Sequence, residues 1–248
     1  MAVFYKPRAR LRGGGMKALV TGAARGLGLG LCTVLQSHGY EVIAACRTST
    51  AELEALGVRV VTGIDLSTKA SIEALRAGVG GDKLDLVVCN AGLNASFVAV
   101  KLSEVDLDVM AHEYQVNALG SVRTAIALMP SLREGAKVIF ITTGSGVTGK
   151  SPPSPGQWGY RMSKMALHTM AYQLAAELRP QGVAVRLVSP GAVNTDLMKR
   201  IFAAGRITTD PDKLPSPVAA AERLYPRIAE LTLEHTGEWV NFSGEVWG

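Results

Sequence analysis

The sequence predicts an α/β domain built on a doubly wound parallel sheet, and three observations carry that prediction. Short runs rich in Val, Ile and Leu alternate with longer helical patterns along the 248-residue chain. These runs are apolar throughout rather than alternating, as expected for strands that helices cover on both faces. No internal repeat or long linker divides the pattern, so we expect a single domain over residues 16–248.

The strand-like segments follow one another in a regular order. They comprise residues 17–22, 41–46, 58–63, 84–90, 136–142, 183–189 and 237–242. A helical pattern over 26–37 separates the first two, and another over 162–178 precedes the sixth. Two Pro-rich loops, at 150–159 and 208–217, are expected to border the functional site.

Residues 1–15 form a basic arm that we expect to lie outside the fold. The arm carries four cations and no acid, and the net charge falls from +5 to +1 without them. The rest of the chain is therefore nearly neutral, which gives no support to a nucleic-acid surface. The arm is Arg-rich like a transit peptide, but it is short and lacks serine. We favour an upstream start or a non-native leader, because Met16 opens the first strand.

Cysteine and histidine usage favours a metal-free cytoplasmic protein. Cys32, Cys46 and Cys89 are widely spaced within apolar runs, as packed and reduced thiols are. The four histidines lack the spacing of metal ligands. No uncharged apolar run reaches the 18 or so residues that a membrane-spanning helix needs.

The segment TGAARGLG at 21–28 follows the first strand and opens the first helix. Gly22, Gly26 and Gly28 permit a tight turn and let a pyrophosphate approach the backbone, where the helix N-terminus offers unpaired N–H groups. In a βαβ context this pattern predicts a dinucleotide site. The second strand ends at Arg47 rather than at a carboxylate, and Arg25 precedes Gly26. Both cations favour the 2′-phosphate of NADP(H) over the free ribose of NAD.

Tyr160 and Lys164 are four residues apart in GYRMSK, so on a helix they share one face. Such a pair occurs by chance in many proteins, as a surface aromatic beside a solvated charge. Its meaning depends on the other motifs of the chain.

Together with the glycine spacing, this pair resembles the short-chain dehydrogenase/reductase family, and the likeness extends from Met16 to about Phe242. The family motifs TGxxxGxG, NNAG and YxxxK correspond here to TGAARGLG, CNAG and YRMSK. An Asp after the third strand, a helical Asn and a PGxxxT segment are matched by Asp65, Asn117 and SPGAVNTDL. The segments YRMSK and HTGEWVNFSGE are most similar to C-factor-like and sniffer-like carbonyl reductases.

The resemblance implies a Rossmann fold and an NADP(H)-dependent oxidoreductase that acts on a small carbonyl or alcohol. Tyr160 would be the acid for reduction and the base for oxidation, because a developing alkoxide needs a proton donor at its oxygen. The cations of Lys164 and of the oxidised nicotinamide would lower the pKa of this tyrosine from about 10. Asn117 would hold a water that links Lys164 to solvent. The implied cofactor contacts are Thr21, Gly22, Arg25, Gly26, Leu27, Gly28, Arg47, Asp65, Leu66, Asn90, Ala91, Gly92, Tyr160, Lys164, Pro190, Gly191, Val193 and Thr195.

The sequence departs from the family at the catalytic serine. The strand end FITTGSG places Thr143 where the family has serine, with Ser145 two residues later. Thr143 also has a hydroxyl that can donate to a carbonyl oxygen, although its methyl group restricts the rotamers. We favour Thr143, and Ser145 is the alternative if the loop is rearranged.

Three further expectations concern function and assembly. The alternative function is an NADPH-binding redox sensor without turnover, and the missing serine supports it. The glycine spacing and the chain length disfavour an epimerase or dehydratase. A lid over 197–215 with Met198, Ile201 and Phe202 suggests a hydrophobic ketone or aldehyde. We also expect a homodimer or homotetramer. The helix over 162–178 carries much apolar surface, namely Met165, Leu167, Met170, Ala171, Leu174 and Leu178.

Overall fold

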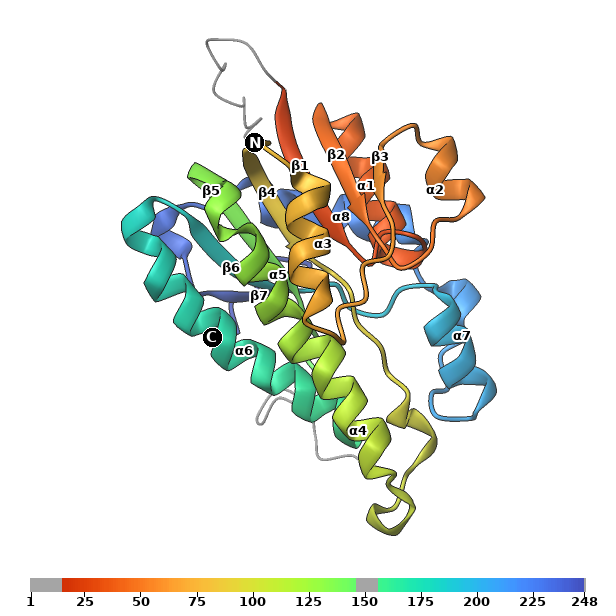
Figure 1. Ribbon diagram of the computed structural model, residues 1–248. Coiled ribbons are helices and arrows are strands. Elements are labelled where there is room, and N and C mark those ends of the chain that lie inside the picture. Colours follow the sequence, from red (N-terminus) through yellow and green to blue (C-terminus); the bar gives the residue numbers. More distant parts are fainter. Residues whose placement is uncertain (1–14, 146–155, 248) are drawn as a thin grey trace.

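Figure 1 shows the computed structural model, which describes residues 15–145 and 156–247. Within these ranges seven strands form one parallel sheet in the order β3-β2-β1-β4-β5-β6-β7. The expected doubly wound fold is therefore confirmed, and a strand overlaps each of the seven expected segments. The strands are β1 (Met16–Thr21), β2 (Tyr40–Ala45), β3 (Arg59–Val61), β4 (Leu84–Cys89), β5 (Leu132–Ile141), β6 (Ala184–Ser189) and β7 (Trp239–Asn241). Apart from Gly15, the basic arm lies outside the described residues.

Helices cover both faces of the sheet (Figure 1). One face packs against α1 (Gly26–Ser37), α2 (Ala51–Ala55) and α8 (Pro217–Ala229). The other packs against α3 (Ala70–Val79), α5 (Gly120–Leu128) and α6 (Trp158–Leu178). Two further helices, α4 (Leu107–Tyr114) and α7 (Asp196–Ala203), lie toward the bottom of Figure 1. The strands β1, β2, β4, β6 and β7 and the second half of β5 are largely buried, as their continuous apolar runs predict, whereas the edge strand β3 is not.

The strand order reverses beside β1, because the chain moves outward through β2 and β3 and then returns to β4 on the other side of β1. In open α/β sheets, ligands bind at the carboxyl ends of the strands next to such a switch point. This edge faces the bottom of Figure 1, where the loops after β1, β4 and β5 meet.

The long helix α6 begins four residues earlier than the sequence suggested. Leu167, Ala171, Leu174 and Leu178 pack in the core of the single chain, so they do not supply the surplus apolar surface expected of them. Exposed apolar side chains remain on this layer, namely Tyr114, Ile126, Met162, Met165 and Tyr172. No helix among the described residues is both long and apolar enough to cross a membrane.

A cluster of rings beneath the end of β5 connects the sheet to the C-terminus. His168 forms a 2.6 Å hydrogen bond with Thr142 and packs edge-on against Trp239, which packs in the same way against Trp247. The Trp247 ring in turn lies against Gly144, where a Cβ atom would approach it to 2.7 Å. Burial and the charge of Lys164 lower the pKa of His168 to about 4.

This shift predicts acid-dependent stability. Unfolded His168 titrates near 6.5, so between about pH 6.5 and 4 the unfolded chain binds a proton that the folded protein excludes. Its contribution to the free energy of unfolding is complete above about pH 6.5 and falls by about 3 kcal/mol toward pH 4. We expect His168→Gln to reduce this loss in urea unfolding across that range. His38→Gln, at an exposed histidine, is the control, and equal pH dependence of both variants would contradict the assignment.

Candidate active site

The glycine turn between β1 and α1 is shaped by contacts that exclude side chains. Gly22 and Gly26 have φ values of +66° and +55°, in the left-handed region that favours glycine. A Cβ atom on Gly28 would lie 2.2 Å from the carbonyl oxygen of Gly22. No side chain of the described residues caps the start of α1, and its first turn holds no acid. The N–H groups and the positive end of the helix dipole remain available for an anion.

Asn90 joins the glycine turn to the end of β4. Its side-chain amide donates to the carbonyl oxygens of Thr21 at 3.0 Å and Gly22 at 3.3 Å. The Thr21 hydroxyl oxygen accepts from the backbone N–H groups of Asn90 and Ala91 at 3.1 and 3.2 Å. Asn90, Ala91 and Gly22 therefore meet at the switch point, although they are about seventy residues apart in sequence.

Three charged residues follow the ends of β1, β2 and β3 in turn. Arg25, Arg47 and Asp65 are all exposed, and the backbone N–H of Gly63 donates to the Arg47 carbonyl oxygen at 2.9 Å. Hydrogen bonds from Ser67 lower the pKa of Asp65, and the charge of Arg47 lowers it further. Leu66 is buried. Both guanidinium groups are therefore accessible to a charged ligand.

The four expected catalytic residues come together at the ends of β4 and β5. Tyr160 and Lys164 lie on one face of α6, with the Lys164 ammonium 6.0 Å from the centre of the Tyr160 ring. Lys164 Nζ donates to the carbonyl oxygen of Ile141, the last residue of β5, at 2.9 Å. A hydrogen bond joins the side chains of Thr143 and Tyr160. The backbone N–H of Ser145 donates to Thr143 Oγ1 at 3.1 Å.

The pKa of Tyr160 differs from the expectation. Burial raises it to about 12, the hydrogen bond from Thr143 opposes that rise, and the negative charge of Glu113 adds to it. Lys164 is not among the groups that shift the pKa of Tyr160, and burial lowers the pKa of Lys164 itself to about 8. Burial therefore shifts both groups toward their neutral forms.

Asn117 lies in a π-helical turn, Gln115–Leu119, that joins α4 to α5. Such turns are frequent at functional sites. Its side-chain amide exchanges two 2.8 Å hydrogen bonds with the backbone of Leu93 and donates to Ser163 at 2.9 Å. Asn117 thereby ties the loop after β4 to α6. No sequence pattern pointed to Ser163, or to the buried Glu113 one turn before Asn117.

The loop after β6 approaches the glycine turn. Thr195 caps α7, and its methyl group would be 3.3 Å from a Cβ atom on Gly26. Val193 is buried, whereas Pro190 is partly buried and Gly191 is exposed. The expected lid contains α7, and Arg206 within it donates to the Val98 carbonyl oxygen at 2.8 Å. The lid and the loop after β4 therefore meet beside the site. Most of the first Pro-rich loop lies outside the described residues.

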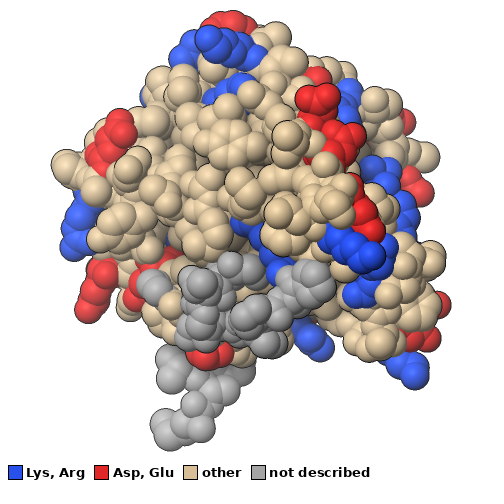
Figure 2. Space-filling model, turned by 90° about the horizontal axis from the view of Figure 1, so that it is seen from below, with Lys and Arg blue, Asp and Glu red and all other residues tan. Residues whose placement is uncertain are grey.

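These features fit a dinucleotide. The crowded glycines, the uncapped helix and the two cations are what a pyrophosphate and an adenosine phosphate require. Figure 2 shows this edge from below, with uncharged surface in the middle of the view and Lys and Arg side chains gathered at the lower right. Among the described residues no group of three or more His, Cys, Asp or Glu could hold a metal ion.

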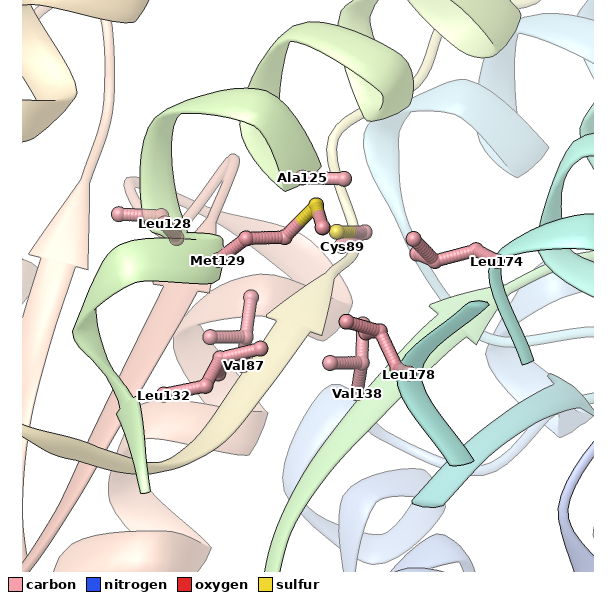
Figure 3. Close-up of a pocket in the computed structure, with 9 residues that line it drawn as sticks. All are labelled: Val87, Cys89, Ala125, Leu128, Met129, Leu132, Val138, Leu174 and Leu178. Atoms are coloured by element: carbon pink, nitrogen blue, oxygen red, sulfur yellow. The ribbon is translucent and has the colours of Figure 1, made fainter. Parts of the chain in front are cut away.

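A small cavity elsewhere is not the substrate site. It lies between the sheet and helices α5 and α6, with apolar side chains around it (Figure 3). Its volume of about 10 Å³ holds at most about one water molecule. Cys89 borders it, and burial raises the pKa of this thiol to about 12. We interpret the cavity as a gap in core packing.

Known proteins share both the sequence and the fold of this chain. The short chain dehydrogenase profile matches residues 16–205. The 1-hydroxy-2-glutathionyl-2-methyl-3-butene dehydrogenase of Rhodococcus sp. (strain AD45) is 35% identical over 228 residues, which cover 91% of this chain and 96% of the relative. The C-signal protein of Myxococcus xanthus is 32% identical, over 70% of this chain and 97% of its own. An NADPH-bound carbonyl reductase from chicken fatty liver superposes with a TM-score of 0.77 at 23% identity, covering 94% of this chain and 98% of that one. The profile match and the two sequence relatives show that this chain belongs to the short-chain dehydrogenase/reductase family.

Proposed function

We propose that this protein is an NADP(H)-dependent oxidoreductase of the carbonyl reductase type. The observation that carries the proposal is the contact of Thr143 with Tyr160, beside Lys164 and Asn117, at the edge where the glycine turn ends. Its substrate is a small carbonyl compound or the corresponding alcohol. Buried Cys32, Cys46 and Cys89 support a cytoplasmic location.

The cofactor would lie across the switch point. The turn Gly22–Gly28 and the N-terminus of α1 would hold its pyrophosphate, and Asp65, Leu66, Asn90, Ala91 and Gly92 would surround the adenosine. Thr195 and Val193 would meet the nicotinamide carboxamide, and Lys164 its ribose. When bound, the nicotinamide supplies or accepts the hydride.

The protein's own side chains donate and replace the proton of the reaction. A carbonyl oxygen that receives hydride at its carbon becomes an alkoxide, and Tyr160 is the protonated acid placed to neutralise it. Thr143 would donate a hydrogen bond to the same oxygen and orient the tyrosine. Lys164, whose pKa is lowered to about 8, can exchange a proton near neutral pH and so restore that of Tyr160.

Mutations at these positions test the mechanism. We expect Tyr160→Phe to reduce kcat about 10²- to 10⁴-fold for carbonyl reduction, because the ring remains but the acid is lost. NADPH affinity should change little, whereas Lys164→Met should weaken both turnover and cofactor binding. Thr143→Val should raise the activation free energy of turnover by about 1–3 kcal/mol, and Ser145→Ala should reduce turnover only slightly. A fully active Tyr160→Phe variant would refute the mechanism. If Ser145→Ala reduced turnover more than Thr143→Val, Ser145 would take the role of the family's catalytic serine.

The preference for NADPH rests on Arg25 and Arg47. Both are exposed at the corner where the adenosine ribose would lie, and no acid ends β2. The chicken carbonyl reductase that shares the fold binds NADPH. Arg47→Asp should lower the ratio of kcat/KM for NADPH over NADH by about 10- to 100-fold, because a phosphate contact becomes a repulsion. Arg223→Asp on α8 is the control, and equal efficiency of the parent with both cofactors would overturn the preference.

The absence of turnover would favour the alternative, a redox sensor. In that case NADPH would bind in a one-to-one ratio while no member of a broad panel of ketones and aldehydes is reduced. The panel should be weighted toward hydrophobic carbonyls, since Met198, Ile201 and Phe202 lie on the lid helix.

We also propose a homodimer or homotetramer that forms through α4, α5 and α6. The exposed side chains of Met162, Tyr172 and Ile126 are 60%, 71% and 46% accessible, an apolar layer that a partner subunit would cover. Light scattering at micromolar concentration should show an oligomer, and combined Met162→Glu and Tyr172→Glu substitutions should shift it toward monomer. Val218→Glu, at an exposed site on α8, is the control. A stable monomer of the parent would contradict the proposal.

A further inference from the structure

Glu113 is a fully buried acid in α4, one helical turn before Asn117. Its Oε1 atom accepts from the backbone N–H groups of Ala95 and Ser96 at 2.5 and 2.8 Å. Its Oε2 atom is also buried and has no hydrogen-bond partner within the described ranges. A buried carboxylate that is only half satisfied is costly, so a compensating interaction is expected nearby.

The compensating group is the N-terminus of α6. A Cβ atom on Gly159, the second residue of that helix, would lie 2.3 Å from Glu113 Oε2 and 2.7 Å from the Cα atom of Met110. Only glycine lets the first turn of α6 approach the carboxylate so closely. Helix α6 has no acid in its own first turn and no side-chain cap among the described residues. Glu113 supplies the missing negative charge to the positive end of the helix dipole.

The same acid is linked to Tyr160 by two routes. Gly159 directly precedes Tyr160 in the chain. The backbone N–H of Tyr160 also donates to Ser96 Oγ at 3.4 Å, and Ser96 is held by Glu113. Asn117 and Glu113 together fix the loop after β4, at Leu93 and at Ala95–Ser96 respectively.

We propose that Glu113 is a positioning residue of the active site: it holds Ser96 and the first turn of α6 in place, and its negative charge keeps the proton on Tyr160. This inference rests on the proposed role of Tyr160 as the acid. A fixed negative charge opposes the formation of a second one on the phenolate. It therefore favours the reduction of a carbonyl, which needs protonated tyrosine, over the oxidation of an alcohol.

Other charges bear on the same tyrosine. Lys164 opposes Glu113 in sign, but its pKa is lowered by burial, and Cys89 is neutral because burial raises the pKa of its thiol. His168 is neutral above about pH 4. Besides Tyr160 itself, the charged or titratable side chains on the elements packed here are Asp108, His112, Glu113 and Tyr114 on α4, Arg161, Lys164, His168, Tyr172 and Glu177 on α6, and Asp85 and Cys89 on β4.

The test is the pH dependence of carbonyl reduction in the full-length protein with NADPH. Glu113→Gln keeps the shape and one carbonyl oxygen for the two N–H groups, and it removes the charge. We expect the alkaline loss of kcat to move to lower pH by about one unit. The pH at which alcohol oxidation becomes active should also move down, by a similar number of pH units. Glu113→Asp retains the charge, so its pH profile should stay near that of the parent even if kcat falls.

Glu104→Gln is the matched control. Glu104 also accepts two backbone N–H groups of the same loop, at Val100 and Lys101, but it is exposed. Its loss should leave the profile unchanged. If Glu113→Gln does not fold, Gly159→Ala should displace the carboxylate and shift the profile in the same direction. An unshifted profile in whichever variant folds would overturn the role of Glu113.

A second measurement separates this inference from the proposed function. The phenolate absorbance of Tyr160, taken as the difference between the parent and Tyr160→Phe, can be titrated in the NADP⁺ complex without any substrate. It should appear at lower pH in Glu113→Gln. If no carbonyl is reduced but this shift is found, the proposed function fails and the effect of Glu113 on the tyrosine stands. If carbonyls are reduced and neither shift is found, the inference about Glu113 fails alone.

Discussion

The hydrogen bonds between Asn90 and the end of β1 are the constraint on which the rest of the site depends. They extend the pairing of β1 with β4 past the last residues of both strands, at the switch point. The glycine turn begins on one side of this contact, and the loop toward Leu93 begins on the other. Gly28 has no room for a side chain because the Gly22 carbonyl and the Asn90 amide both crowd it. The glycine turn and the start of the loop after β4 are therefore parts of one packed unit.

From that unit the loop after β4 passes to α4 and α6, and polar side chains fix it at each step. Asn117 completes the backbone hydrogen bonds of Leu93, and Glu113 does the same for Ala95 and Ser96. Both residues come from one continuous helical segment with a π turn in it. A regular helix would carry Asn117 to a different angle relative to Glu113. Because of this π turn, one helical segment forms hydrogen bonds with two parts of the loop.

The electrostatics of the site follow from burial more than from pairing. Tyr160 and Lys164 are shifted in opposite directions, the tyrosine upward to about 12 and the lysine downward to about 8, and burial is the leading cause of both. Each shift favours a neutral group. A neutral tyrosine beside a lysine that titrates near physiological pH suits proton delivery, and Glu113 adds to the retention of that proton.

The sequence by itself determined the fold class, the approximate place of all seven strands and the motif positions. Apolar runs, glycines and the i,i+4 pair are local sequence patterns, so they can be recognised without knowledge of the tertiary contacts. Only the tertiary structure shows that Thr143 lies against Tyr160, because the path of the loop after β5 is set by contacts between residues distant in the sequence, such as Gly144 and Trp247. It also decided the direction of the Tyr160 pKa and the role of Glu113. A glutamate in an amphipathic helix resembles any surface acid, and its burial arises from the approach of Gly159, forty-six residues away in the sequence.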